Sequence, residues 1–125
     1  MKILYRGKRL DTGNWVRGFF VHLSDGEGRS SDRIYTGFAE SDCGEFYPDF
    51  FEVDPNTVGQ YIGIDDVHGE PIFEGDHVMV CDSRRQGLPA PVKYSKDECA
   101  FVLARRGYNP INFSDDVKYK VVGRE

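Results

Sequence analysis

Turn-forming residues divide this chain into short pieces, which restricts it to short strands joined by tight connections. Fourteen glycines and six prolines are spread along 125 residues, and these residues favour turns over long regular elements. No window of ten or more positions repeats apolar residues at helical spacing. Nine Phe, seven Tyr and one Trp are enough to fill a compact β core. The sequence therefore predicts an all-β fold with little helix.

Alternating apolar and polar residues predict about eight or nine short strands, which is typical of a small β-barrel or sandwich. Gly18 lies inside the strand expected over residues 15–23 and indicates a bulge or a close backbone approach. One face of that strand is expected to carry Trp15, Phe19, Val21 and Leu23. Pro48 interrupts residues 46–53, so this segment is expected at a sheet edge.

The second half of the chain has the size of an SH3-like barrel. It contains about five short strands in about 60 residues, with a hairpin expected over Lys96–Asp97. In its last strand Tyr119 is expected to face inward, and Lys118 and Lys120 to face water. We expect a single domain over residues 1–125; the alternative is an N-terminal β subdomain over 1–64 and an SH3-like barrel over 65–125.

Charge is distributed unevenly along the sequence. The net charge is −5, yet there is no Lys or Arg between Ile34 and Ser83, a window that contains twelve acids. The flanks hold all 16 basic residues and 9 acids (21 − 12), so the middle carries −12 and the ends +7 (16 − 9). Such asymmetry either steers association or is mixed on the surface when the segments fold together.

Three cysteines, Cys43, Cys81 and Cys99, occur without a CxxC pair, so neither a zinc knuckle nor a redox motif is indicated. No apolar run approaches the ~18 residues of a membrane span. The N-terminal residues lack the apolar segment of a signal peptide. We therefore expect reduced thiols, no membrane association and a cytoplasmic location.

One segment carries a specific resemblance. Residues 52–80, EVDPNTVGQYIGIDDVHGEPIFEGDHVMV, resemble the core signature of the YopX-like family of bacteriophage and prophage proteins. The opening motif Gly13–Gly18 and the closing Tyr119–Gly123 are also similar to the family. The signature residues are Asp54, Pro55, Gly59, Gln60, Gly63, Asp65, Gly69, Gly75, Asp76 and Val78.

The resemblance implies a small all-β fold with an SH3-like part, encoded by a phage or prophage and able to form oligomers. It implies no biochemical activity and no catalytic residues, so we expect no enzyme and no cofactor. Turn geometry alone accounts for the signature. Asp54 and Pro55 are expected to start one helical turn that Gly59 ends. Gly63, Gly69 and Gly75 are expected at positive φ, and Asp65 and Asp76 as acceptors of backbone N–H groups. Ile72, Phe73 and Val78 are expected in the core.

Two ligand sites are weaker alternatives. Carboxylates are dense from residue 65 to residue 76, and hard cations prefer such ligands, but the spacing is not that of an EF-hand. The five are Asp65, Asp66, Glu70, Glu74 and Asp76. A second, His/Cys arrangement would combine His77, Cys81 and Cys99.

Nucleic-acid binding is the other alternative function. SH3-like barrels support it, and six basic residues with neighbouring aromatics are candidates for the contact face. They are Arg84, Arg85, Arg105, Arg106, Lys118 and Lys120. Against it, the chain is acidic, with a pI near 5.2, whereas phosphate contacts require several positive charges together.

The preferred interpretation is a phage accessory protein that acts as a protein–protein interaction or oligomerisation module. Its partner would be a second copy or an unidentified host or phage protein. An acidic middle and basic ends are complementary to each other, and two very small subdomains gain stability by association.

Overall fold

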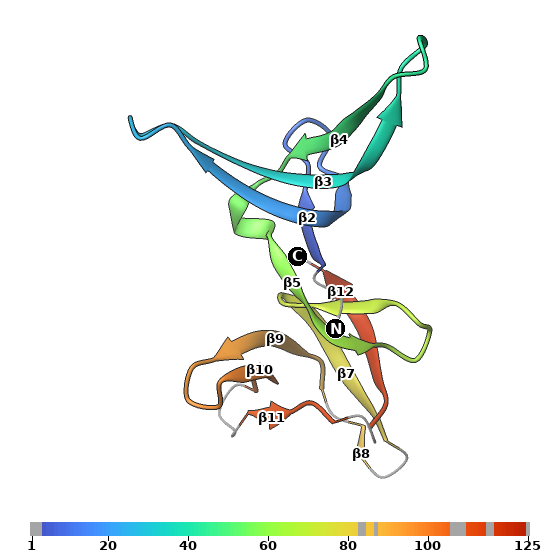
Figure 1. The fold of residues 1–125 in the computed structure, drawn as a ribbon. Coiled ribbons are helices and arrows are strands. Elements are labelled where there is room, and N and C mark those ends of the chain that lie inside the picture. The colour runs from blue at the N-terminus through green and yellow to red at the C-terminus, as the bar shows by residue number, and fades with distance from the viewer. Residues whose placement is uncertain (1–3, 83–84, 87, 106–109, 115–116, 125) are drawn as a thin grey trace. The chain divides into compact units, whose positions relative to one another are not determined.

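The computed structural model describes residues 4–82, 85–86, 88–105, 110–114 and 117–124, and strands dominate it (Figure 1). Apart from one 3₁₀ turn, every regular element in these ranges is a strand. All the strand pairs described are antiparallel. The predicted all-β class is confirmed. The twelve described strands exceed the number expected, because two- and three-residue strands are too short to show alternation.

The chain divides into two compact units, an N-terminal unit (Lys2–Gln60) and a C-terminal unit (Tyr61–Glu125). The division falls inside strand β5 (Gly59–Asp65). It lies earlier in the chain than the boundary after Ile64 that the sequence suggested. Within the described residues there is no helix with the length and apolarity that a membrane crossing requires.

Four consecutive strands form the N-terminal unit. They are β1 (Tyr5–Lys8), β2 (Trp15–Ser24), β3 (Ser30–Glu40) and β4 (Phe46–Glu52). The start of β5 pairs with β1, so the order is β4-β3-β2-β1-β5. The predicted edge position of the Pro48 segment is confirmed, since β4 lies at the end of this order. An edge tolerates proline because one side of the strand needs no N–H donor.

The core of this unit centres on Ile34 and Val53, whose exposed fractions are 0% and 1%. β1 passes directly over them: a Cβ added at Gly7 would lie 3.0 Å from the Cβ of Val53. Two backbone hydrogen bonds join the end of β4 to the end of β1, from Leu10 N–H to the Glu52 carbonyl and from Asp54 N–H to the Lys8 carbonyl. The first four strands therefore enclose a small interior.

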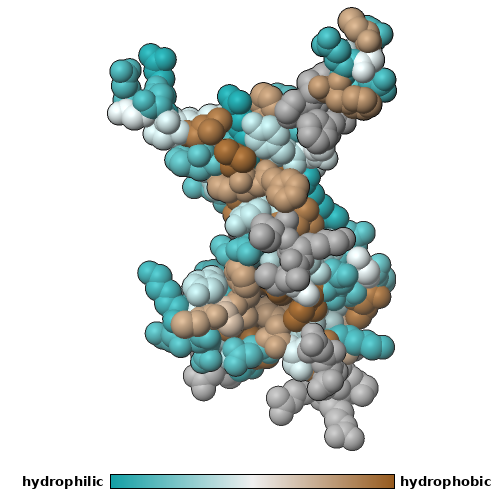
Figure 2. Space-filling model, viewed as in Figure 1, coloured by the Kyte–Doolittle hydropathy of each residue, from teal (hydrophilic) through white to brown (hydrophobic). Residues whose placement is uncertain are grey.

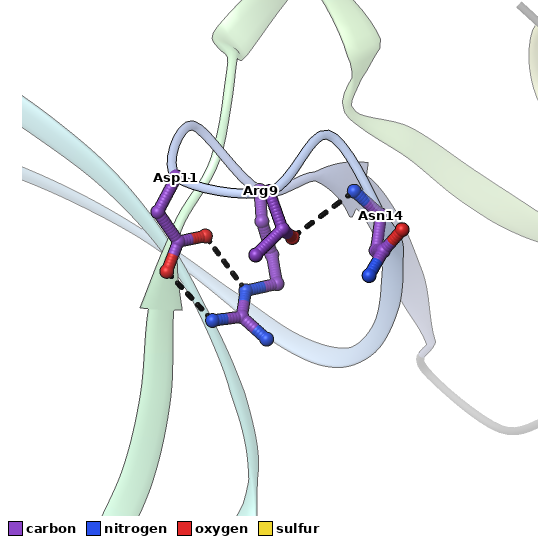
Figure 3. A network of polar contacts seen from close by, with 4 residues as sticks. Arg9, Asp11 and Asn14 are labelled. Atoms are coloured by element: carbon purple, nitrogen blue, oxygen red, sulfur yellow. Dashed lines mark hydrogen bonds and ion pairs between the residues drawn. The ribbon is translucent and has the colours of Figure 1, made fainter.

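The β1–β2 turn is closed by a bidentate ion pair (Figure 3). Arg9 Nε and Nη2 donate to the two carboxylate oxygens of Asp11 at 2.9 and 2.6 Å, which lowers the pKa of Asp11. The backbone N–H of Arg9 donates to the carbonyl of Asn14 at 2.9 Å. The same guanidinium lies 4.0 Å from the centre of the Phe51 ring, so the turn is attached to the interior of the sheet.

Gly18 in β2 confirms the predicted close approach. A Cβ at this position would lie 1.9 Å from the carbonyl oxygen of Tyr35 in β3. The register between β3 and β4 shifts between Tyr35 and Gly37, so an irregularity lies beside the contact. Only a residue without a side chain fits here.

The C-terminal unit contains the end of β5 and seven further strands. These are β6 (Pro71–Phe73), β7 (Asp76–Asp82), β8 (Arg85–Gln86), β9 (Ala90–Ser95), β10 (Ala100–Leu103), β11 (Ile111–Asn112) and β12 (Tyr119–Arg124). One sheet has the order β11-β10-β9-β7-β12. The predicted hairpin over Lys96–Asp97 is confirmed, since Ser95 pairs with Ala100. An SH3-like barrel stays a prediction for this unit.

The core of the C-terminal unit matches the expected residues. Ile72, Phe73 and Val78 are each 0% exposed, and Tyr119 is 2% exposed. Lys118 and Lys120 are exposed, as their alternation with Tyr119 predicted.

Local turn chemistry explains most of the structure of residues 52–80, the segment that carries the family resemblance. Asp54 caps η1 (Pro55–Thr57) by accepting from the Asn56 N–H at 3.0 Å. Gly63, Gly69 and Gly75 have the expected positive φ, at 93°, 80° and 93°.

Two local expectations are wrong. Gly59 does not end the helical turn: Thr57 is its last residue, Val58 is its C-cap, and Gly59 already belongs to β5. Asp65 accepts from the Tyr61 hydroxyl at 2.7 Å, and its neighbour Asp66 takes the backbone bonds instead.

Candidate functional site

Strand register aligns three aromatic side chains on one face of the N-terminal sheet. Phe19 of β2 lies opposite Tyr35 of β3, and Tyr35 lies opposite Phe50 of β4. Directly opposed residues of antiparallel strands point to the same face. The Tyr35 and Phe50 ring centres are 5.4 Å apart. The result is an aromatic row that crosses three strands.

This row belongs to an exposed surface that we call the aromatic face. Its members are Arg17, Phe19, Leu23, Arg33, Tyr35, Phe50 and Glu52. Phe19, Leu23 and Phe50 are 66%, 43% and 41% exposed. Figure 2 shows apolar surface on the N-terminal unit between hydrophilic side chains. Exposed apolar surface of this kind marks sites of interaction more often than isolated apolar residues do.

Two arginines accompany the aromatic row. The Arg33 guanidinium lies 4.6 Å from the centre of the Phe50 ring and donates to Ser31 Oγ at 3.1 Å. It also lies 3.9 Å from the Glu52 carboxylate. Arg17 precedes Phe19 by two positions, so it points to the same face, and it is exposed. Aromatic residues and arginine are the types enriched in protein interfaces.

The other face of the same sheet is the inner one. Phe20, Ile34 and Phe51 are aligned across β2, β3 and β4, and Ile34 is fully buried. The Phe20 ring also packs on Tyr5, with ring centres 5.5 Å apart. Two adjacent pairs, Phe19–Phe20 and Phe50–Phe51, therefore place one ring on each face, and the outer ring of each pair is the one exposed.

The β3–β4 turn forms a second distinct surface, which we call the acidic tip (residues 40–46). Ser41 N–H donates to the Glu45 carbonyl at 2.8 Å, and Gly44 N–H to the Ser41 carbonyl at 2.9 Å. The exposed acids at this tip are Glu40, Asp42 and Glu45, and no basic residue lies among them. Phe46, next to Glu45, is 72% exposed. An apolar side chain and three carboxylates are thus presented together.

The carboxylates considered for a metal site do not assemble into one. Among the described residues no group of three or more His, Cys, Asp or Glu side chains is arranged to hold a metal ion. Asp66 Oδ1 accepts from the N–H groups of His68 and Glu70, at 2.8 and 3.0 Å. Asp76 accepts from the Phe73 N–H at 2.9 Å, as predicted. These two carboxylates organise backbone turns.

Asp66 also joins its loop to the last strand. Its Oδ2 accepts from the Val121 N–H at 3.4 Å, and Val67 N–H donates to the Tyr119 carbonyl at 2.8 Å. Burial alone would raise the pKa of Asp66, but the hydrogen bonds from three backbone N–H groups outweigh it and hold the pKa below its ordinary value.

The His/Cys candidates are separate features. His77 and Cys81 belong to β7, whereas Cys99 is exposed in the β9–β10 turn with a φ of 53°. All three cysteines are free thiols, as expected. Among the described residues they do not form a metal-binding group.

The candidate nucleic-acid residues are only partly described. Arg84 and Arg106 lie outside the described residues, and for Arg85 only the backbone, in β8, is described. Lys118, just before β12, and Lys120, in β12, are both exposed, and β12 is separated from β8 by β7. Arg105 follows β10 and is also exposed. Among the described candidates, Lys118 and Lys120 lie close together, at the start of β12.

A hollow of about 340 Å³ lies in the C-terminal unit. It is lined by Ile62, Ile64, Glu98, Ala100, Phe101, Asn112 and Phe113. Small-molecule sites combine apolar walls with several convergent polar groups. This hollow offers one carboxylate and one amide, so it ranks below the aromatic face as a functional candidate.

Comparison with known proteins gives one positive result. The family model described as YopX protein matches residues 4–124, which is nearly the whole chain and includes both units. None of the curated proteins and none of the solved structures compared with the chain matches it.

Proposed function

The chain belongs to the YopX family, and from this premise we propose that it is a phage- or prophage-encoded accessory protein that acts as an oligomerisation module. The proposal places it in the host cytoplasm and makes a second copy of the same chain its partner. It assigns no catalytic step. The observation that carries it is the exposed aromatic row of the N-terminal sheet, formed by Phe19, Tyr35 and Phe50.

The energetic argument rests on Phe19. A phenylalanine buries about 150–250 Å² when it is covered, and Phe19 is 66% exposed. Covering the rest removes about 130 Å² from water, which at ~25 cal/mol per Å² contributes up to about 3 kcal/mol. Phe50 and Leu23 add to this on the same face. Association therefore gains apolar burial that the isolated unit does not obtain.

The charges of the face also favour a protein partner over nucleic acid. Glu52 lies beside Arg33 on this face, and the whole chain carries a net charge of −5. Phosphate recognition requires several uncompensated positive charges. A partner with apolar and acidic groups fits the face better.

The test measures mass in solution at micromolar concentrations by light scattering. We expect the wild-type chain to exceed the 14.2 kDa of one copy and the Phe19→Ser/Phe50→Ser variant to fall to it. Leu88→Ser is the matched control, because Leu88 is 91% exposed and lies in the C-terminal unit. Phe19→Ser alone separates interface loss from any effect of Phe50 on its neighbours Tyr35 and Arg33.

A wild-type chain that keeps the mass of one copy at every concentration would reject self-association. Retention of the assembled mass by the Phe19→Ser/Phe50→Ser variant would reject this face as its site. Polarisation measurements with labelled single-stranded DNA provide the competing outcome: saturable binding that Phe19→Ser weakens would reassign the face to nucleic acid.

A further inference from the structure

The N-terminal unit carries two surfaces of opposite charge. On the aromatic face, Arg17 and Arg33 outnumber Glu52, which gives a charge of +1 (2 − 1). The acidic tip has Glu40, Asp42 and Glu45 and no basic residue, which gives −3. In Figure 1 the β3–β4 turn projects beyond the middle of the N-terminal sheet. The two surfaces therefore occupy different places on the same unit.

We propose that these surfaces bind each other between copies, so that the acidic tip of one chain docks on the aromatic face of the next. This inference rests on the proposed function and specifies its geometry. Phe46, 72% exposed, packs against Phe19 and Phe50 of the neighbouring copy. The carboxylates beside it lie near Arg17 and Arg33 of that copy.

Charge decides between this arrangement and a two-fold one. Face-to-face contact would bring the Arg17 and Arg33 side chains of both copies together, and tip-to-tip contact would bring six carboxylates together (3 + 3). Like charges in an interface are unfavourable, whereas complementary potentials select partner and register. The tip-on-face contact is the one that pairs unlike charges.

The local structure of both surfaces supports docking without rearrangement. Three hydrogen bonds within the turn hold the tip, including Glu45 N–H to Ser41 Oγ at 3.2 Å. Arg33 is held over Phe50 by its contacts with Ser31 and Glu52. Surfaces that are ordered before binding lose less conformational entropy on association.

A contact between two different surfaces has a consequence for assembly. Each copy retains one unoccupied tip and one unoccupied face after pairing. Such heterologous contacts propagate until they close into a ring or extend as a filament. The assembly is therefore expected to exceed two copies.

Mixing two charge-reversed variants tests the geometry. The face variant is Arg17→Glu/Arg33→Glu, and the tip variant is Glu40→Lys/Asp42→Lys/Glu45→Lys. Each alone is expected to weaken self-association about tenfold or more. In the mixture the intact tip of the face variant meets the intact face of the tip variant, and the two reversed surfaces are complementary to each other, so the expected product contains both chains in alternation and is larger than either variant alone. Combining all five substitutions in one chain is expected to restore larger assemblies.

The β2–β3 turn supplies the controls. Arg29 and Glu27 are exposed there, so Arg29→Glu and Glu27→Lys reverse the same charges away from both surfaces and are expected to leave the mass unchanged. Circular dichroism melting establishes that each variant is folded. If Arg33→Glu unfolds the sheet, Arg17→Glu alone takes its place, because Arg17 is exposed.

The outcomes separate this inference from the proposed function. If Phe19→Ser/Phe50→Ser dissociates the protein while the tip variant assembles normally, the module stands and the tip-on-face contact is wrong. If the mixture of face and tip variants gives only single chains, the contact is also wrong. If the wild-type chain is a single copy throughout, both proposals fail.

Discussion

Replacing Gly18 by alanine is the sharpest test of how the N-terminal sheet is built. The added Cβ would lie 1.9 Å from the Tyr35 carbonyl oxygen, about 1.4 Å less than the ~3.3 Å of a close C···O contact. The oxygen belongs to backbone, so it has no rotamer into which it can move. β2 and β3 must separate, or the irregularity beside Gly37 must rearrange.

The cost follows from these two responses. Overpacking in a well-packed region costs about 1–3 kcal/mol and more where the backbone must shift, and each lost backbone hydrogen bond adds about 1 kcal/mol. We expect a destabilisation of about 4 kcal/mol. For a chain of this size that lowers the melting temperature by about 15 °C.

Thermal unfolding followed by circular dichroism measures the effect, with Gly123→Ala as the control. Gly123 is also a strand glycine, but its added Cβ meets only the Cβ of His77 at 3.9 Å, an ordinary contact. Alanine there is expected to be neutral or to stabilise by up to about 1 kcal/mol. If Gly18→Ala had the same melting temperature as Gly123→Ala and the wild type, the close approach of β2 and β3 would be wrong.

Two further predictions concern polar groups of the C-terminal unit. Asp66→Ala removes the acceptor of three backbone N–H groups and is expected to cost about 2 kcal/mol in urea unfolding at neutral pH, whereas Asp66→Asn keeps an acceptor oxygen and costs less. Because the pKa of Asp66 is lowered in the fold, its charge stabilises the protein above the ordinary pKa of 3.8. The stability advantage of the wild type over Asp66→Asn therefore disappears as pH falls through the lowered value. A stability advantage that grew on acidification would contradict this. Burial is the larger cause, and hydrogen-bond donation to Asp65 at 2.7 Å the second, of a Tyr61 pKa raised to about 12. In a titration followed by tyrosinate absorbance, Tyr61→Phe is expected to remove the step near that pH. Loss of a step at lower pH would refute the assignment.

Sequence predicted those parts of the fold that depend on neighbouring residues. The pair Asp54–Pro55 favours a capped helical turn through local interactions alone. Gly63, Gly69 and Gly75 have positive φ because the turns at these positions require it. The edge position of β4 followed from one residue without an N–H, Pro48. These features need no knowledge of distant contacts.

The choice between Asp65 and Asp66 could not be read from the sequence. Adjacent residues at the end of a strand point in opposite directions, so one carboxylate turns toward the loop and the other does not. Asp65 ends β5 and meets Tyr61, four positions earlier on the same face. Asp66 begins the loop and binds its backbone. The position at which β5 ends decides which of the two carboxylates binds the loop backbone, and pairing with distant strands sets that position.

The candidate surface was missed for a related reason, and the signal for it was present. Phe19–Phe20 and Phe50–Phe51 are apolar at two adjacent positions, so whichever face is buried, the other also carries a ring. A strand that belongs to a sheet with one wet face normally alternates apolar and polar residues. Adjacent aromatic pairs in two strands therefore indicate a sheet with two faces to cover.

The fold covers one of these faces and leaves the other to association. Ile34 and Val53 complete the inner face, while Phe19 and Phe50 remain exposed on the outer one together with Arg17 and Arg33. Apolar surface alone would accept many partners, but arginines beside it make an acidic partner favourable and a basic one unfavourable. The same chain supplies an acidic surface with an exposed ring, Phe46, at the start of its own β4. A sheet built this way gives each copy both halves of a contact that it cannot complete alone.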